Sequence, residues 1–215
     1  MKRTLTIPSE LSEITLKQHQ EASSKGDKLT DEQLVSIYCK IPLDEVLQLP
    51  NNIYNKASQT LAKLTEKFEG KHELQMRFKL NGVEYGMIPN LDEITYGEHK
   101  DLKQYLVDWK TMHLAMSVLY RPIANGFGKT YSIEKYKGTK EHREVMQHMP
   151  LDIVMSAQLF FYSLTQDLLK AIPNYLERAV RNSKGQTQSQ SIIQTGEAMM
   201  KYSASLKETL EGLRR

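Results

Sequence analysis

The chain has 215 residues, a length that suits one domain or one domain with an appendage. Hydrophobic residues make up 40% and charged residues 26%, a balance that excludes wholesale disorder. The net charge of +3 is too small for a typical nucleic-acid-binding domain, and no stretch of about 18 apolar residues predicts a membrane span.

The N-terminal third predicts short extended and helical elements. Leu5–Ile7 alternates between apolar and polar residues, which favours a short edge strand or an extended arm. Thr30 and Gln33 form a capping-box pattern, so a helix begins here and ends before Pro42, where a short second helix follows. Apolar residues at helical spacing predict a longer helix over residues 53–68.

The clearest local signal is a pair of alternating segments joined by Asn81-Gly82. An Asn-Gly pair between two alternating segments predicts a β-hairpin with a type I′ turn, because both turn residues need positive φ. We place the strands near 73–80 and 83–88 and expect one face of the hairpin to pack on the core. The apolar positions are Leu74, Met76, Phe78, Leu80, Val83, Tyr85 and Met87.

Two long helices dominate the rest of the chain. A capping box at Thr95 predicts a helix over 95–119, and a short strand follows near 131–133. A helix over 151–182 carries an internal Pro173 that should kink it. The stripes that we expect to meet in the core are Trp109, Met112 and Met116 on the first helix and Phe160, Leu164 and Leu168 on the second.

The C-terminal part differs in composition from the rest of the chain. Residues 183–191 contain no apolar side chain and predict a linker, and residues 192–215 carry a narrow helical seam of the coiled-coil kind. Such a helix gains stability only by docking on its own body, on a second copy or on another protein. The long linker favours an intermolecular contact. The predicted partner-binding residues are Met199, Tyr202, Leu206, Leu210 and Leu213.

These elements predict an α+β fold that is predominantly helical, with a β-hairpin at about 73–88 and a tethered C-terminal helix. The expected organisation is a helical body over 1–182, a polar linker over 183–191 and an interaction helix over 192–215.

The sequence contains no residue pattern that is typical of a catalytic, nucleotide-binding or metal-binding site. Gly126–Thr130 has the end of a phosphate-binding loop, but the glycine that this motif needs five residues before Gly128 is Ile123. Cys39 lies at the end of a predicted helix and is better explained as a buried small side chain. The histidines show no zinc-ligand spacing, and His113 is better explained as a core or boundary residue. We therefore expect no enzyme activity, no cofactor and no metal.

Two segments resemble a known group of proteins. The hairpin and the Tyr96-Gly97-Glu98 helix start within residues 78–98, together with residues 108–113 and 119–122, resemble small proteins encoded among the structural and tail genes of tailed bacteriophages. The hairpin followed by this helix start is similar to tail assembly chaperones. The resemblance covers roughly residues 30–180.

The resemblance implies a non-enzymatic morphogenesis protein that acts by protein–protein interaction. A tail assembly chaperone would bind the tape-measure protein in the host cytoplasm during assembly and keep its apolar helices from aggregating. The alternative is a virion structural protein of the head–tail connector, ring or baseplate. The implied partners are tape-measure, tail or connector subunits or a second copy of the chain, with no nucleic acid and no membrane.

Overall fold

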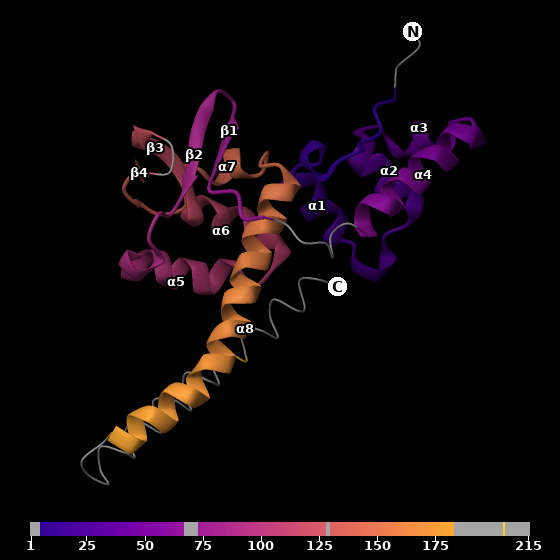
Figure 1. Ribbon diagram of the computed structural model, residues 1–215. Helices are drawn as coiled ribbons and strands as arrows, with labels where there is room; N and C mark the ends of the chain where they lie inside the picture. The colour runs from indigo at the N-terminus through magenta and orange to yellow at the C-terminus, as the bar shows by residue number, and fades with distance from the viewer. Residues whose placement is uncertain (1–4, 67–72, 128–129, 183–203, 205–215) are drawn as a thin grey trace. The chain divides into compact units, whose positions relative to one another are not determined.

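The computed structural model describes residues 5–66, 73–127, 130–182 and 204 (Figure 1). The chain divides into two compact units, Met1–Ser156 and Ala157–Arg215. The expectation of a helix-rich α+β fold is confirmed. Among the described residues, no helix combines the length and the apolar character that a membrane crossing requires.

Four helices form the N-terminal part of the first unit. Thr15 and Thr30 each begin a helix with a capping box, in which the threonine hydroxyl and a glutamine three residues later exchange hydrogen bonds with the backbone. Residues Leu5 to Ile7 form no strand, which leaves the extended arm of the two predicted alternatives. The helices are α1 (Leu16–Ser23), α2 (Asp31–Cys39), α3 (Leu43–Leu47) and α4 (Asn51–Glu66).

A four-stranded antiparallel sheet follows, with the strands in the order β1-β2-β3-β4. Asn81 and Gly82 join the first two strands with φ values of 51° and 81°, as the Asn-Gly pattern requires. The two strands of the hairpin are shorter than the predicted segments, and the four strands of the sheet have the following bounds. They are β1 (Arg77–Leu80), β2 (Val83–Met87), β3 (Tyr120–Phe127) and β4 (Thr130–Ile133).

Strand β3 lies where the sequence predicted the end of a helix and a loop. The strand contains Pro122, which cannot donate a hydrogen bond to a neighbouring strand. Pro122 lies opposite Tyr85 of β2, and its carbonyl accepts a hydrogen bond from the Glu134 amide at 3.0 Å on the β4 side. The pairing with β4 begins only at Ile123, so the missing N–H group of Pro122 lies at the end of that ladder. Gly126 lies within β3 and pairs with Tyr131 of β4, so it belongs to a strand and not to a phosphate-binding loop.

One face of the sheet belongs to the core. Phe78, Tyr85, Met87 and Tyr120 are all buried, and the Phe78 ring stacks on Tyr85 and meets Tyr120 edge-on. Met112 and Met116, which were expected in the core, are buried, and so are Met146, Met149 and Met155.

The predicted helix over 95–119 is broken into α5 (Tyr96–Tyr105), a short 3₁₀ turn (Trp109–Thr111) and α6 (Met112–Leu119). The interruption has a local cause. The Asp108 carboxylate accepts a hydrogen bond from the Lys110 amide at 2.9 Å, and the Thr111 hydroxyl donates to the carbonyl of Tyr105. These side chains satisfy backbone groups outside a helix, which competes with helix continuation.

Trp109 is consequently half-buried and does not continue the apolar stripe of α6. Its ring meets the ring of His19 edge-on, with the centroids 4.3 Å apart.

After the sheet come α7 (Arg143–Met146) and α8 (Leu151–Asn182), and the latter is continuous through Pro173. The start of α8 is held by the N-terminal segment, because Leu151 donates to the carbonyl of Ile14 and Leu16 donates to the carbonyl of Met149, both at 2.9 Å. Val154 and Ala157 are fully buried, whereas Leu164 is 38% exposed. The prediction that Leu164 lies in the core is therefore wrong.

Candidate functional site

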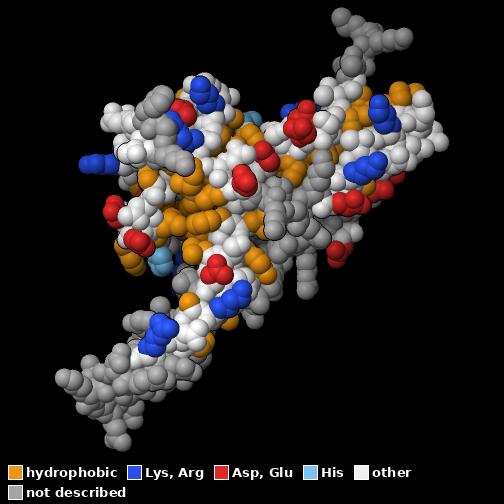
Figure 2. All heavy atoms as spheres, in the orientation of Figure 1, with side chains coloured by type: hydrophobic (Ala, Val, Ile, Leu, Met, Phe, Trp, Pro, Cys, Tyr) orange, Lys and Arg blue, Asp and Glu red, His pale blue; other side chains and the backbone are white. Residues whose placement is uncertain are grey.

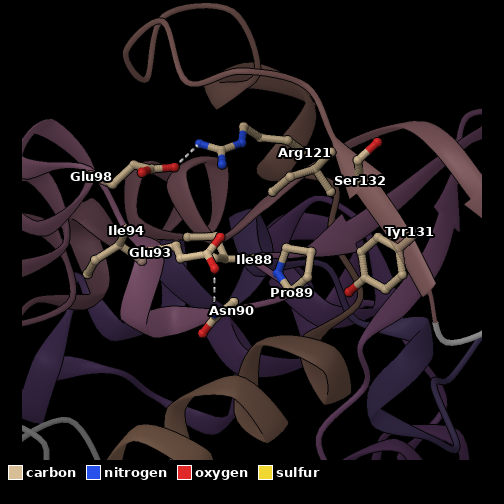
Figure 3. A pocket seen from close by; sticks show the side chains of 10 residues that line it. Ile88, Pro89, Asn90, Glu93, Ile94, Glu98, Arg121, Tyr131 and Ser132 are labelled. Carbon is tan, nitrogen blue, oxygen red and sulfur yellow. Dashed lines mark hydrogen bonds and ion pairs between the residues drawn. The ribbon is translucent and has the colours of Figure 1, made fainter.

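A hollow of about 340 Å³ lies where the chain leaves β2, crosses to α5 and passes β3 and β4 (Figure 3). This volume is within the range of roughly 300–1,000 Å³ that is usual for ligand pockets. Hydrophobic side chains gather between the sheet and α5 in the space-filling view (Figure 2). The lining residues are Ile88, Pro89, Asn90, Glu93, Ile94, Glu98, Arg121, Tyr131, Ser132 and Ile133.

A buried ion pair forms the polar end of the hollow. Nη1 of Arg121 lies 2.5 Å from Oε1 of Glu98, and the two residues are only 6% and 4% exposed. Glu98 is held in place by the capping box of α5, in which its Oε2 accepts a hydrogen bond from the Thr95 amide at 2.6 Å. The same carboxylate therefore starts a helix and fixes the guanidinium of a strand residue.

Two further side chains surround this pair. The Arg121 guanidinium lies over the ring of Tyr136, 5.5 Å from its centroid. The Tyr136 hydroxyl donates a hydrogen bond to the carboxylate of Asp101, one turn along α5 from Glu98. Burial and this carboxylate raise the pKa of Tyr136. The cluster of Glu98, Asp101, Arg121 and Tyr136 thus joins α5 to the sheet and the segment after β4.

The cluster is suited to recognition and not to proton transfer near neutral pH. Burial acts to raise the pKa of Glu98, but hydrogen bonds from Thr95 and the Arg121 guanidinium outweigh it, so the pKa is lowered and the carboxylate stays ionised. An arginine side chain does not lose its proton in proteins. Among the described residues, Nε of Arg121 has no hydrogen-bond partner although it is buried.

The apolar wall of the hollow depends on the position of Tyr131. Its hydroxyl is 2.8 Å from the carbonyl oxygen of Met87 and 3.1 Å from that of Met76, and it can donate to either. Its ring passes over Gly86, where an added Cβ would lie 2.4 Å from Cε2 of the ring. Arg77 lies over the same ring. Tyr131 is therefore fixed at both ends, and the hollow has a rigid side.

A second group of side chains has the types that bind divalent cations. Nε2 of His142 lies 3.6 Å from Glu134 and 4.0 Å from Glu141, and the three potential ligand atoms lie within 4.8 Å of one another. Both carboxylates are exposed, and Nζ of Lys137 lies 3.5 Å from Glu141. This arrangement is an ion-pair cluster at the surface, of a kind that is common without a metal ion.

Two residues that the sequence offered as candidates for catalysis or metal binding, Cys39 and His113, are part of the packed fold. Cys39 is buried, and burial raises the pKa of its thiol to about 11, which makes it a poor nucleophile. His113 is half-buried, with Nδ1 3.0 Å from Nε2 of Gln20, as the interpretation of a boundary histidine requires.

The predicted partner-binding residues cannot be placed, because they lie outside the described residues. These are Met199, Tyr202, Leu206, Leu210 and Leu213. The hollow itself was missed in the sequence. The sequence indicates Glu98 only as a capping residue, and the available signal was Arg121, a charged residue two positions after the apolar helix α6.

Comparisons of the chain with protein-family models, with curated proteins and with solved structures gave no match.

Proposed function

We propose that this protein is a non-enzymatic bacteriophage morphogenesis protein that acts by protein–protein interaction, most simply as a tail assembly chaperone. The observation that carries the proposal is the apolar stripe of α8. Val154 and Ala157 on this stripe are fully buried, Phe160 and Phe161 are half-buried, and Leu164 is 38% exposed. The stripe therefore continues beyond the residues that bury it.

The length of α8 makes this stripe a usable surface. Its 32 residues correspond to a rod of about 48 Å. Phe160 and Phe161 meet edge-on with their centroids 5.3 Å apart, which holds two large rings in place on the helix. A helix with a partly exposed apolar stripe gains stability when another helix covers it. This is the chemistry needed to hold an apolar helix of a client protein.

The resemblance of residues 78–98 to tail assembly chaperones supplies the biological setting. In this proposal the client is the tape-measure protein, and binding takes place in the host cytoplasm before the tail tube polymerises. The linker over 183–191 would tether the interaction helix over 192–215, whose seam from Met199 to Leu213 would cover the client together with α8.

Co-expression with the tape-measure protein tests the proposal. The full-length chain should keep the tape-measure protein in the soluble fraction and co-purify with it. Leu164→Glu should abolish co-purification because it places a charge on the apolar stripe, without lowering the melting temperature. Leu47→Glu is the matched control, because Leu47 is 71% exposed on α3 in the other unit.

Two outcomes would contradict the proposal. If Leu164→Glu co-purifies with the client as well as the unmodified chain does, the α8 stripe is not the interaction surface. If mass spectrometry finds the protein in purified virions at stoichiometric amounts, the chaperone role is wrong, and a connector, ring or baseplate component is the correct class.

A further inference from the structure

We propose that the hollow beside Arg121 is a peptide-binding site, which accepts an uncharged segment of a partner polypeptide with one apolar side chain inserted. The site belongs to the first unit and is separate from the stripe of α8. Its failure would therefore leave the proposed function intact.

The lining of the hollow defines an apolar side chain as one part of the ligand. Ile88, Pro89, Ile94 and Ile133 form its apolar part, and the fixed ring of Tyr131 closes one side. Ile94 and Ile133 are half-buried, so part of this wall remains open to an incoming group. A ligand side chain that covers this wall would gain about 25 cal/mol of binding free energy for each Å² of apolar surface removed from water.

The polar groups of the hollow match the two polar groups of a peptide unit. The guanidinium of Arg121 faces Ile88 and Glu93 across the hollow and can donate a hydrogen bond to a carbonyl oxygen (Figure 3). The carboxylate of Glu93 is exposed at the same hollow and is oriented by Nδ2 of Asn90, which donates to it at 2.9 Å. It can accept a hydrogen bond from a peptide N–H group.

The charge balance argues against an anionic ligand. The single positive charge of Arg121 is already paired with Glu98, and Glu93 adds a second negative charge to the lining. An incoming carboxylate or phosphate would therefore meet a site whose lining carries a net negative charge. A neutral backbone segment does not meet this repulsion, and it supplies an acceptor for the guanidinium.

An exposed aromatic side chain lies next in the sequence to this wall. Tyr96 follows Ile94 by two residues, in the first turn of α5, and is 83% exposed. Exposed tyrosines are frequent contributors to protein–protein interfaces, because they bury a large ring and retain a polar group. Tyr96 does not line the hollow, but its exposed ring is available for an additional contact with a partner.

Binding of three short peptides to the isotopically labelled full-length protein, measured by NMR, tests the proposal. The probes are N-acetyl-Ala-Ile-Ala-amide, N-acetyl-Ala-Ser-Ala-amide and N-acetyl-Ala-Ile-Ala with a free carboxylate. The first should shift the amide signals of residues 88–94 and 131–133 in a saturable way. The serine peptide and the free acid should each bind at least about fivefold more weakly.

Two variants locate the site. Ile94→Asp should lower the affinity for the isoleucine amide by about tenfold, whereas Leu47→Asp, on an exposed position of α3, should not change it. Both spectra must keep the dispersion of the unmodified protein, and Ile94→Ser replaces Ile94→Asp if it does not. The absence of saturable shifts at about 20 mM peptide, or tighter binding of the free acid than of the amide, would overturn the proposal.

Discussion

Substitution of Gly86 by alanine should destabilise the protein through one close contact. A Cβ at this position would lie 2.4 Å from Cε2 and 2.9 Å from Cδ2 of Tyr131, and 3.1 Å from Cγ1 of Ile123. Carbon atoms in ordinary contact are about 3.5–4.0 Å apart, so the ring would have to move by about 1 Å or more. The ring cannot move freely, because its hydroxyl is bonded to backbone carbonyl oxygens of Met76 and Met87.

The expected cost follows from these contacts. Adding a carbon to a packed site costs about 1–3 kcal/mol, and loss of the Tyr131 hydrogen bond adds about 1 kcal/mol. The smaller conformational entropy of an unfolded chain with alanine returns about 0.4–1 kcal/mol. The net loss in the free energy of unfolding should therefore be about 1–3.5 kcal/mol.

Urea denaturation of the full-length protein measures this loss. Gly97→Ala is the matched control, because its Cβ would lie 3.6 Å from the nearest atom, on Tyr136, in the first turn of α5. It should leave the stability unchanged or raise it by up to about 1 kcal/mol. If Gly86→Ala unfolds at the same urea concentration as the unmodified protein, the tight packing of Tyr131 on Gly86 is wrong.

Three further changes test other parts of the fold. Glu98→Gln should lower the free energy of unfolding by about 3–5 kcal/mol near neutral pH. This loss of stability should shrink as the pH falls below 4.5 and through the lowered pKa of Glu98. A loss that does not depend on pH would exclude the ion pair as its cause. Burial lowers the pKa of His19 from 6.5 to about 4, so on acidification the unfolded chain takes up this proton first. The free energy of unfolding should therefore fall by about 1.4 kcal/mol per pH unit between pH 6.5 and about 4. His19→Leu should remove this pH dependence, and an unchanged pH profile of the variant would contradict the prediction. Gly82→Val should lower the melting temperature because φ is +81° there, whereas Gly82→Asn should be tolerated; equal melting of the two variants would refute the turn geometry.

Features of the fold that depend on a few neighbouring residues could be predicted from the sequence. The capping boxes at Thr30 and Thr95 and the turn at Asn81-Gly82 form by hydrogen bonds and φ preferences within four residues, and each begins or joins an element where expected. The burial of Met112 and Met116 was predictable from helical spacing, which indicates which face of a helix is apolar.

Features that depend on distant residues could not be predicted in the same way. Strand β3 contains Pro122 and carries an irregularity, and its first residues are held by pairing with β2, which is distant in the sequence. Glu98 is explained by its capping box alone, and Arg121 by the end of a predicted helix. Nothing in their spacing of 23 residues indicates that the two side chains form an ion pair. The partner-binding seam from Met199 to Leu213 stays a prediction.

The hydrogen bonds between the N-terminal segment and the start of α8 have a consequence for folding kinetics. Thr15 pairs with Pro150, and Leu16 and Lys17 donate to the carbonyl groups of Met149 and Gln147. These contacts close a loop of roughly 135 residues, and such closure must be achieved before its contacts contribute any stability. During synthesis the contacts of Thr15, Leu16 and Lys17 with residues 147–151 can therefore form only after these late residues have left the ribosome.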